Sequence, residues 1–259
     1  EFKLMGLSSF GSPNFVDQIR KIISFENNKL NLDMNYFDFD NNLFNSYSNK
    51  LEELFGIEAN NSPISIEKNK NFQTYADIAA STQIILHEIV LKIFRMAYKQ
   101  SGIKNFSFTG GVALNCKLIS DLSKESFIDN LFIPPSPGDS GSSIGAAYFG
   151  FIHENNTTTK IKNQDHQNIY PGVFKQDPSF LEEVLEKICD TDEIIDKSSQ
   201  LLLENNIIAT CIDNIETGPR SLGNRSLLCN ADNLSLVKNL SENIKGREGF
   251  IPVAPSMLR

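Results

Sequence analysis

Arginine side chains gather near the C-terminal end of the sequence, where their spacing suits an anionic ligand. Arg220 and Arg225 lie in the glycine-bearing turn GPRSLGNRS (218–226), and Lys245 and Arg247 follow in KGREGF (245–250). Only six of the 24 basic residues are arginine, so lysine is the usual cation of this chain. A guanidinium group can bind a phosphate or carboxylate through two parallel hydrogen bonds. The four cations predict one shared polyphosphate site, with surface charge pairs as the alternative.

Two further segments combine glycine with chemistry-bearing side chains. FTGGVALN (108–115) is typical of a strand, a Gly110-Gly111 turn and a helix start, which lets backbone N–H groups approach a phosphate or ribose. PPSPGDSGSSIGAA (134–147) has a single carboxylate, Asp139, at a second such corner. That carboxylate could bind a metal ion or cap the following helix. For the Gly110-Gly111 pair, close packing of the chain is an alternative explanation to ligand binding.

The elements that would position these residues alternate between strand and helix. Helical periodicity predicts a helix over 75–101 that Gly102 ends, and Ile85, Ile89 and Ile93 form its apolar stripe. Further strands are expected at 105–109, 130–133 and 207–212, and further helices at 112–122, 142–152, 179–188, 196–205 and 234–245. Residues 27–72 predict irregular or strand–turn surface structure, and 154–168 a linker. This alternation indicates an α/β fold.

Composition excludes several classes of protein. The chain has 259 residues and a net charge of −8, which argues against a general nucleic-acid binder. The charge is uneven, because residues 220–259 carry six cations against three carboxylates. No apolar run is long enough for a membrane span and no leader is recognisable, so we expect a cytoplasmic protein without a membrane partner. The four cysteines show no metal-binding spacing and are expected to be free, mostly buried thiols.

Taken together and in order, these motifs resemble the O-carbamoyltransferases of the nodulation and antibiotic-biosynthesis type. Seven blocks carry the resemblance: KLMGLSSFG (3–11), YADIAASTQ (75–83), FTGGVALNC (108–116), LFIPPSPGDSGSSIGAA (131–147), IYPGVF (169–174), GPRSLGNRSLL (218–228) and KGREGFIPVAPSML (245–258).

The resemblance implies an organisation and an activity. Residues 1–153 would be the C-terminal half of an ATPase-like domain of the actin and sugar-kinase (ribonuclease-H-like) type. Residues 169–259 would begin an α/β domain that resembles threonylcarbamoyl-adenylate synthase. Such a protein uses ATP to convert carbamoyl phosphate to carbamoyl-adenylate. It then passes the carbamoyl group to a hydroxyl of a small-molecule acceptor near a divalent metal ion, typically iron.

The resemblance also assigns roles to residues of this chain. Asp139 matches the metal-binding aspartate, and the other metal ligands would lie upstream of residue 1. The adenylate-forming, catalytic positions correspond to the four cations Arg220, Arg225, Lys245 and Arg247. The nucleotide-binding positions are Gly110, Gly111, Val112, Asn115 and Gly138.

Two rival hypotheses remain. The first half alone would also fit a sugar-kinase-like or chaperone-like ATPase without carbamoyl chemistry. The sequence departs from the family at Cys116-Lys117 after GGVALN, and at Asn214 and Thr217 before GPR, which keeps a degenerate, non-catalytic binding protein open. Because the sequence lacks an initiator Met and a closing element, we expect an internal fragment. Such a fragment would be inactive alone and would expose the Ile85/Ile89/Ile93 stripe.

Overall fold

The computed structural model describes residues 2–40, 46–59, 64, 66, 69–154, 191–212 and 216–256. The IYPGVF block, the predicted helix at 179–188 and most of the predicted linker fall outside these residues. The chain divides into two compact units, which are described separately. The first consists of Glu1–Phe106, Asn115–Asn130 and Gly246–Ala254, and the second of Ser107–Leu114, Leu131–Lys245 and Pro255–Arg259.

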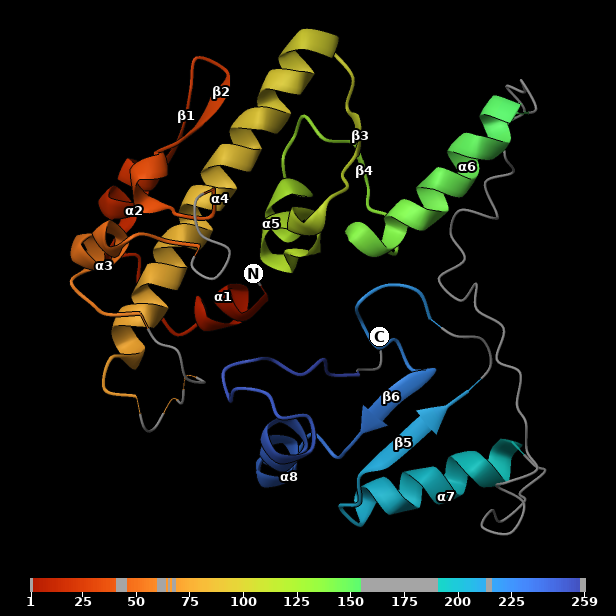
Figure 1. Ribbon diagram of the computed structural model, residues 1–259. Coiled ribbons are helices and arrows are strands. Elements are labelled where there is room, and N and C mark those ends of the chain that lie inside the picture. The colour runs from red at the N-terminus through yellow and green to blue at the C-terminus, as the bar shows by residue number, and fades with distance from the viewer. Residues whose placement is uncertain are drawn as a thin grey trace. The chain divides into compact units, whose positions relative to one another are not determined.

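The first unit is built around one long helix, α4 (Phe72–Ser101), which Figure 1 shows running the length of the unit. Its C-terminal end confirms the predicted stop. Gly102 adopts the left-handed conformation with φ of 69°, and its N–H donates to the carbonyl of Tyr98. Glycine adopts this conformation without the steric cost that a Cβ would add.

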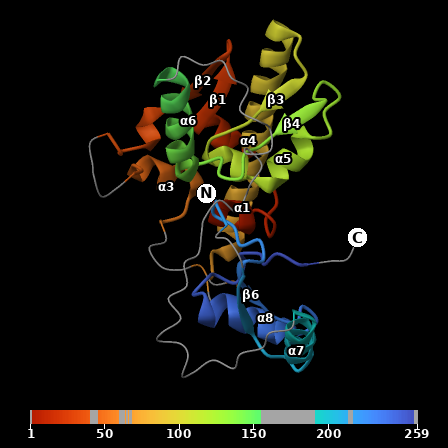
Figure 2. The ribbon, with the colours of Figure 1, turned by 90° about the vertical axis from the view of Figure 1, so that its right-hand side faces the viewer.

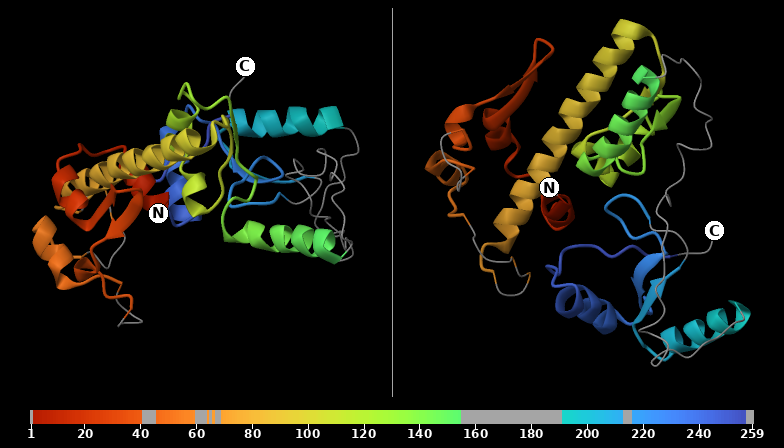
Figure 3. Two further views of the ribbon diagram at one scale, coloured as in Figure 1. Left: turned by 90° about the horizontal axis from the view of Figure 1, so that it is seen from above. Right: turned by 45° about the vertical axis from the view of Figure 1, so that its right-hand side comes forward.

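One side of α4 is covered by α2 (Val16–Ile22) and by the hairpin of β1 (Ile23–Glu26) and β2 (Lys29–Leu32). Both panels of Figure 3 show these elements beside α4. Asn27 and Asn28 both have positive φ, as a two-residue hairpin turn of type I′ requires. Ile19 and Ile22 of α2 pack with Ile85 and Ile89 of α4. The expectation that Ile85 and Ile89 are exposed was therefore wrong, because α2 covers them.

Near its N-terminal end, α4 packs against α1 (Phe2–Leu7), as the view in Figure 2 also shows. Leu7 joins Ala76, Ala79 and Phe250 in a buried cluster. The chain leaving α1 runs so close to α4 that a Cβ on Gly11 would lie 2.0 Å from the Ala76 carbonyl oxygen. Gly11 is therefore required by close backbone approach rather than by its φ angle.

The asparagine-rich segment 27–72 contains more regular structure than its composition predicts. Besides β2, it forms the 3-10 turn η1 (Met34–Tyr36) and the helix α3 (Asn49–Phe55), which Gly56 ends at φ of 66°. Leu51, Leu54 and Phe55 of α3 pack against the Ile19/Ile85 cluster. Tertiary packing thus stabilises a short helix whose polar composition obscures it.

The Gly-Gly motif belongs to the second unit, in a stretch of chain that begins and ends with short strands. β3 (Asn105–Ser107) pairs with β4 (Asn130–Phe132), and between them lie the 3-10 turn η2 (Gly111–Leu114) and the helix α5 (Cys116–Leu122). Both strands are confirmed, although shorter than predicted. The predicted helix at 112–122 begins four residues late, because Asn115 caps α5 and the preceding residues form the 3-10 turn.

The second unit holds the remaining elements. The 3-10 turn η3 (Asp139–Gly141) leads into α6 (Ser142–Glu154), as predicted. Later come α7 (Thr191–Leu203), the antiparallel hairpin of β5 (Ile208–Cys211) and β6 (Arg225–Leu228), and α8 (Leu234–Lys238), which continues as the π-helical turn η6 (Asn239–Ile244). α7 packs against β5. Because β6 begins at Arg225, this arginine lies on a strand rather than in the predicted turn.

The described residues form a mixed α/β structure whose sheets each contain two strands. Among them, no helix combines the length and apolar character needed to cross a bilayer. Cys116, Cys211 and Cys229 are free thiols, as expected, but Cys116 and Cys211 are exposed rather than buried. The proposed division into 1–153, 154–168 and 169–259 stays a prediction.

Candidate functional site

The Gly-Gly turn and the loop before α6 lie against each other in the second unit. The N–H of Gly110 donates to the carbonyl of Pro137 at 2.6 Å, and Gly110 has φ of 96°. A Cβ on Gly138 would stand 3.9 Å from the Cα of Gly111, whereas one on Gly110 or Gly111 would meet nothing within 4 Å. The predicted nucleotide-binding glycines are therefore neighbours, and two of them face open space.

Asp139 is exposed at the first position of η3. Gly138 occupies the N-cap position of η3, and a capping role of Asp139 for α6 stays a prediction. The loop is held tightly, because a Cβ on Gly141 would lie 2.1 Å from the carbonyl oxygen of Ser136. A carboxylate in the first turn interacts favourably with the positive end of the following helix. Asp139 thus presents its charge to solvent.

The arginine-bearing loop meets both of these segments. Gly218 has φ of 97°, and a Cβ there would lie 2.5 Å from the carbonyl oxygen of Pro135. The hydroxyls of Ser136 and Thr217 are 3.0 Å apart. Arg220 donates from Nη2 to the carbonyl of Leu114, in η2, at 2.6 Å. Three motifs that are far apart in the sequence are thereby brought together within one compact unit.

The other three predicted cations have different surroundings. Arg225 donates from Nη1 to the carbonyls of Ile212 and Asn224, both at 2.9 Å. Lys245 is exposed at the end of η6, and Arg247 is exposed in a segment that belongs to the first unit. The convergence of all four cations on one anion stays a prediction.

Glu216 organises the arginine-bearing loop, a role that sequence reasoning missed. Its Oε1 accepts hydrogen bonds from the backbone N–H groups of Leu222 at 2.8 Å and Asn224 at 2.7 Å. Burial acts to raise the pKa of Glu216, but these bonds, a further backbone bond from Arg225 and the Arg225 charge outweigh it and lower the pKa below its usual value. The only available sequence signal was a carboxylate just before a glycine-rich turn.

Two predicted nucleotide-binding positions lie at the other end of the Gly-Gly motif. Val112 is 44% exposed. Asn115, which belongs to the first unit, accepts the N–H of Leu118 at its Oδ1 atom and thus caps α5. It also exchanges two amide hydrogen bonds with Gln83 of α4, both of 3.0 Å. The structure therefore gives Asn115 a structural role, and its contact with a nucleotide stays a prediction.

A metal ion would need more ligands than the described residues offer at Asp139. Among them, no group of three or more His, Cys, Asp or Glu side chains is placed to hold a metal ion. Stable divalent-metal sites in proteins combine several such donors. Asp139 can therefore supply one ligand but does not form a metal site by itself.

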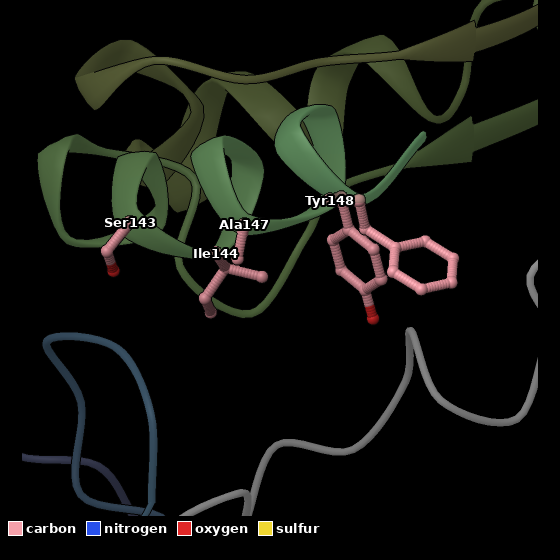
Figure 4. Close-up of a pocket in the computed structure, with 5 residues that line it drawn as sticks. Ser143, Ile144, Ala147 and Tyr148 are labelled. Atoms are coloured by element: carbon pink, nitrogen blue, oxygen red, sulfur yellow. The ribbon is translucent and has the colours of Figure 1, made fainter. Parts of the chain in front are cut away.

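An open pocket of about 560 Å³ runs along α6, just after Asp139 in the chain. Figure 4 shows the side chains of Ile144, Ala147 and Tyr148 pointing away from the helix on this side. The described lining residues all belong to α6: Ser143, Ile144, Ala147, Tyr148 and Phe151. The surface is mainly apolar and has two hydroxyl groups for hydrogen bonding.

Comparison with known families defines the class of protein. A family described as "Carbamoyltransferase N-terminus" matches residues 1–148, and one described as "Carbamoyltransferase C-terminus" matches residues 199–259. The chain belongs to the carbamoyltransferase family, which confirms the resemblance inferred from the motifs.

Individual relatives match along the whole chain. An uncharacterized protein of Synechocystis sp. is 30% identical over 273 residues, covering 100% of this chain and 43% of the relative. Nodulation protein NolNO of Sinorhizobium fredii is 27% identical over 271 residues (100% and 36%). Nodulation protein NolO of Bradyrhizobium diazoefficiens is 24% identical over 268 residues (100% and 45%). The chain thus spans less than half the length of these relatives.

Proposed function

We propose that the chain is part of an ATP-dependent O-carbamoyltransferase that acts on a hydroxyl of a small-molecule acceptor. Carbamoyl phosphate, ATP and one water give carbamoyl-adenylate, pyrophosphate and phosphate. Attack of the acceptor hydroxyl on the carbamoyl carbon then releases AMP. The first part would have the actin and sugar-kinase-like fold and the last part the synthase-like fold.

The observation that carries this proposal is the meeting of three motifs in the second unit. Gly110 contacts Pro137, Gly218 packs against Pro135, and Arg220 binds the carbonyl of Leu114. Two glycine-lined turns with a cation beside them suit a nucleotide, because glycine lets a phosphate approach the backbone closely and a guanidinium binds phosphate. A sugar-kinase-like ATPase would need the first two motifs but not the third.

Each part of the site would have a separate task. Gly110, Gly111 and Gly138 would let the phosphate chain of ATP approach the backbone. Arg220 and Arg225 would stabilise the negative charge that develops when pyrophosphate leaves. A divalent metal such as iron would need ligands in addition to Asp139, so we assign it no step.

The deciding experiment measures pyrophosphate release by the full-length protein with ATP, with and without carbamoyl phosphate. Release that requires carbamoyl phosphate supports the proposal. Release of phosphate from ATP without carbamoyl phosphate would instead identify a kinase-like or chaperone-like ATPase. Nucleotide binding without turnover would identify a degenerate binding protein.

A further inference from the structure

A chain of polar side chains connects α4 to the capping residue of α5 in the first unit. Gln83 is buried, with 4% of its surface exposed, and its amide exchanges two hydrogen bonds with that of Asn115. One turn further along α4, Nε2 of His87 lies 2.6 Å from Nε2 of Gln83. The other ring nitrogen, Nδ1, lies 2.9 Å from a carboxylate oxygen of Asp121.

The donors and acceptors in this chain fix one another in order. The N–H of Leu118 can only donate, so the Asn115 atom that it meets must be the carbonyl oxygen. The amide nitrogen of Asn115 then faces the carbonyl oxygen of Gln83. This orientation leaves the amide nitrogen of Gln83 to donate one hydrogen to Asn115 and the other towards His87.

His87 must therefore accept a hydrogen bond at Nε2, which only a neutral imidazole can do. Its proton then sits on Nδ1 and is donated to Asp121. Burial and the charge of Lys117 together lower the pKa of His87 by more than the charge and hydrogen bond of Asp121 raise it. Asp121 and Lys117, both on α5, are the charged groups that act on the ring, and Asp121 also pairs with Lys124.

Protonation of His87 would reverse this order. An Nε2–H group would face the amide hydrogens of Gln83 at 2.6 Å, and turning the Gln83 amide would relieve the conflict. The Asn115 amide would then have to turn as well, and its NH₂ group would meet the N–H of Leu118. The cap of α5 would be lost. Loss of an N-cap costs about 1 kcal/mol, a factor of about five in an equilibrium.

We propose that Gln83 and neutral His87 are positioning residues that hold the Asn115 amide in the orientation that caps α5 after the Gly-Gly turn. The effect of this orientation on nucleotide binding rests on the proposed function, whereas the orientation of the Asn115 amide itself is independent of that proposal. The cap and the nucleotide affinity should weaken together as His87 becomes protonated.

The test is NMR of the full-length protein with labelled histidine, assigned by comparison with His87→Gln. We expect the Nδ1–H tautomer and titration below 6.5, the ordinary value for histidine. Gln83→Glu places a carboxylate beside Nε2 and should raise the pKa of His87 above 6.5. Exposed His153 supplies the matched control, since His153→Gln should leave the His87 titration unchanged.

Two further readouts separate positioning from a purely structural role. As His87 becomes protonated, hydrogen exchange at the Leu118 amide, corrected for its intrinsic pH dependence, should rise about fivefold. The KM for ATP should rise by a similar factor. Neither increase should occur in His87→Gln. An Nε2–H tautomer, titration above 6.5, or the same pH response in His87→Gln would overturn the inference. If the NMR and exchange results are as expected but turnover does not depend on carbamoyl phosphate, the positioning role of Gln83 and His87 is supported and only the proposed function is rejected.

Discussion

At the scale of single residues, the buried carboxylate of Asp77 anchors the segment that follows α1. Its oxygens accept hydrogen bonds from the backbone of Ser12 at 2.8 Å, Asn14 Nδ2 at 2.8 Å and Gln73 Nε2 at 2.7 Å. One turn along α4, Ser81 accepts the N–H of Phe15. The YADIAASTQ block thus has a structural task in holding residues 12–15 against α4.

Asp77→Ala should therefore destabilise the protein. Removing the carboxylate eliminates three hydrogen bonds to a charged group, each worth roughly 1.5–3 kcal/mol, and water offsets part of the loss because Ser12, Asn14 and Gln73 are exposed. Urea unfolding monitored by circular dichroism measures the loss. Glu53→Ala on the exposed face of α3 is the control and should change the free energy of unfolding by less than about 0.5 kcal/mol. Equal effects of the two substitutions would contradict the anchoring role.

The same residue gives a pH dependence with a definite sign. Burial acts to raise the pKa of Asp77, but hydrogen bonds from Ser12, Gln73 and Asn14 outweigh it and lower the pKa below its usual value of 3.8. The folded state therefore favours the ionised form. The resulting stabilisation is present above pH 3.8 and is lost as the pH falls through the folded pKa. The stability difference between the native protein and Asp77→Ala should shrink in that acidic range.

At the scale of elements, the sequence predicts those helices and strands whose formation depends on residues close together in the chain. The apolar period and Gly102 identify α4, and the small-residue run identifies α6. α3 was missed because its stability depends on packing against residues such as Ile19, and its own composition is polar. The start of α5 was misplaced because the Asn115 cap depends partly on Gln83, 32 residues away in the sequence.

In the candidate site, too, the sequence indicates the motifs but not their contacts with distant segments. Glycines and arginines mark the motifs, but their partners are backbone atoms of distant segments. No pattern at 218–226 shows that Gly218 packs on Pro135 or that Arg220 binds the carbonyl of Leu114. Arg225 was placed in a turn because its glycine-rich neighbours hide the start of β6.

The contact between two loops can be tested at Gly218. Gly218→Ala adds a Cβ that would lie 2.5 Å from the Pro135 carbonyl oxygen, at a φ of 97° that side chains rarely adopt. Gly223→Ala in the same loop imposes a similar strain at φ of 118°, but its Cβ meets nothing within 4 Å. Strain at such positions costs roughly 1–3 kcal/mol.

We expect both substitutions to lower the melting temperature of the full-length protein, and Gly218→Ala to lower it further. Only Gly218→Ala should also raise hydrogen exchange at residues 134–141, because it separates that loop from its neighbour. Equal exchange in the two variants would show that the contact does not stabilise the 134–141 loop.

At the scale of the whole molecule, the chain combines segments that match two family domains. Arg220 belongs to the segment that matches at 199–259, whereas Leu114 belongs to the segment that matches at 1–148. Their hydrogen bond at 2.6 Å lies within the second compact unit, together with the contact between Ser136 and Thr217. Under the proposed function, a carbamoyl-adenylate made beside one segment would react beside the other, where proximity favours transfer over hydrolysis.

Arg220→Ala should therefore lower acceptor carbamoylation by the full-length protein more than it lowers pyrophosphate release. The guanidinium both supplies charge and ties the arginine-bearing loop to η2, and losing one charged hydrogen bond corresponds to roughly tenfold or more in rate. Arg220→Lys keeps the charge but not the planar donor, so it should recover pyrophosphate release while transfer stays impaired. Exposed Arg95, which pairs with Glu125 in the first unit, gives the control Arg95→Ala. If Arg220→Ala slows both steps equally and Arg220→Lys restores both, Arg220 acts through its charge alone and does not couple the segments.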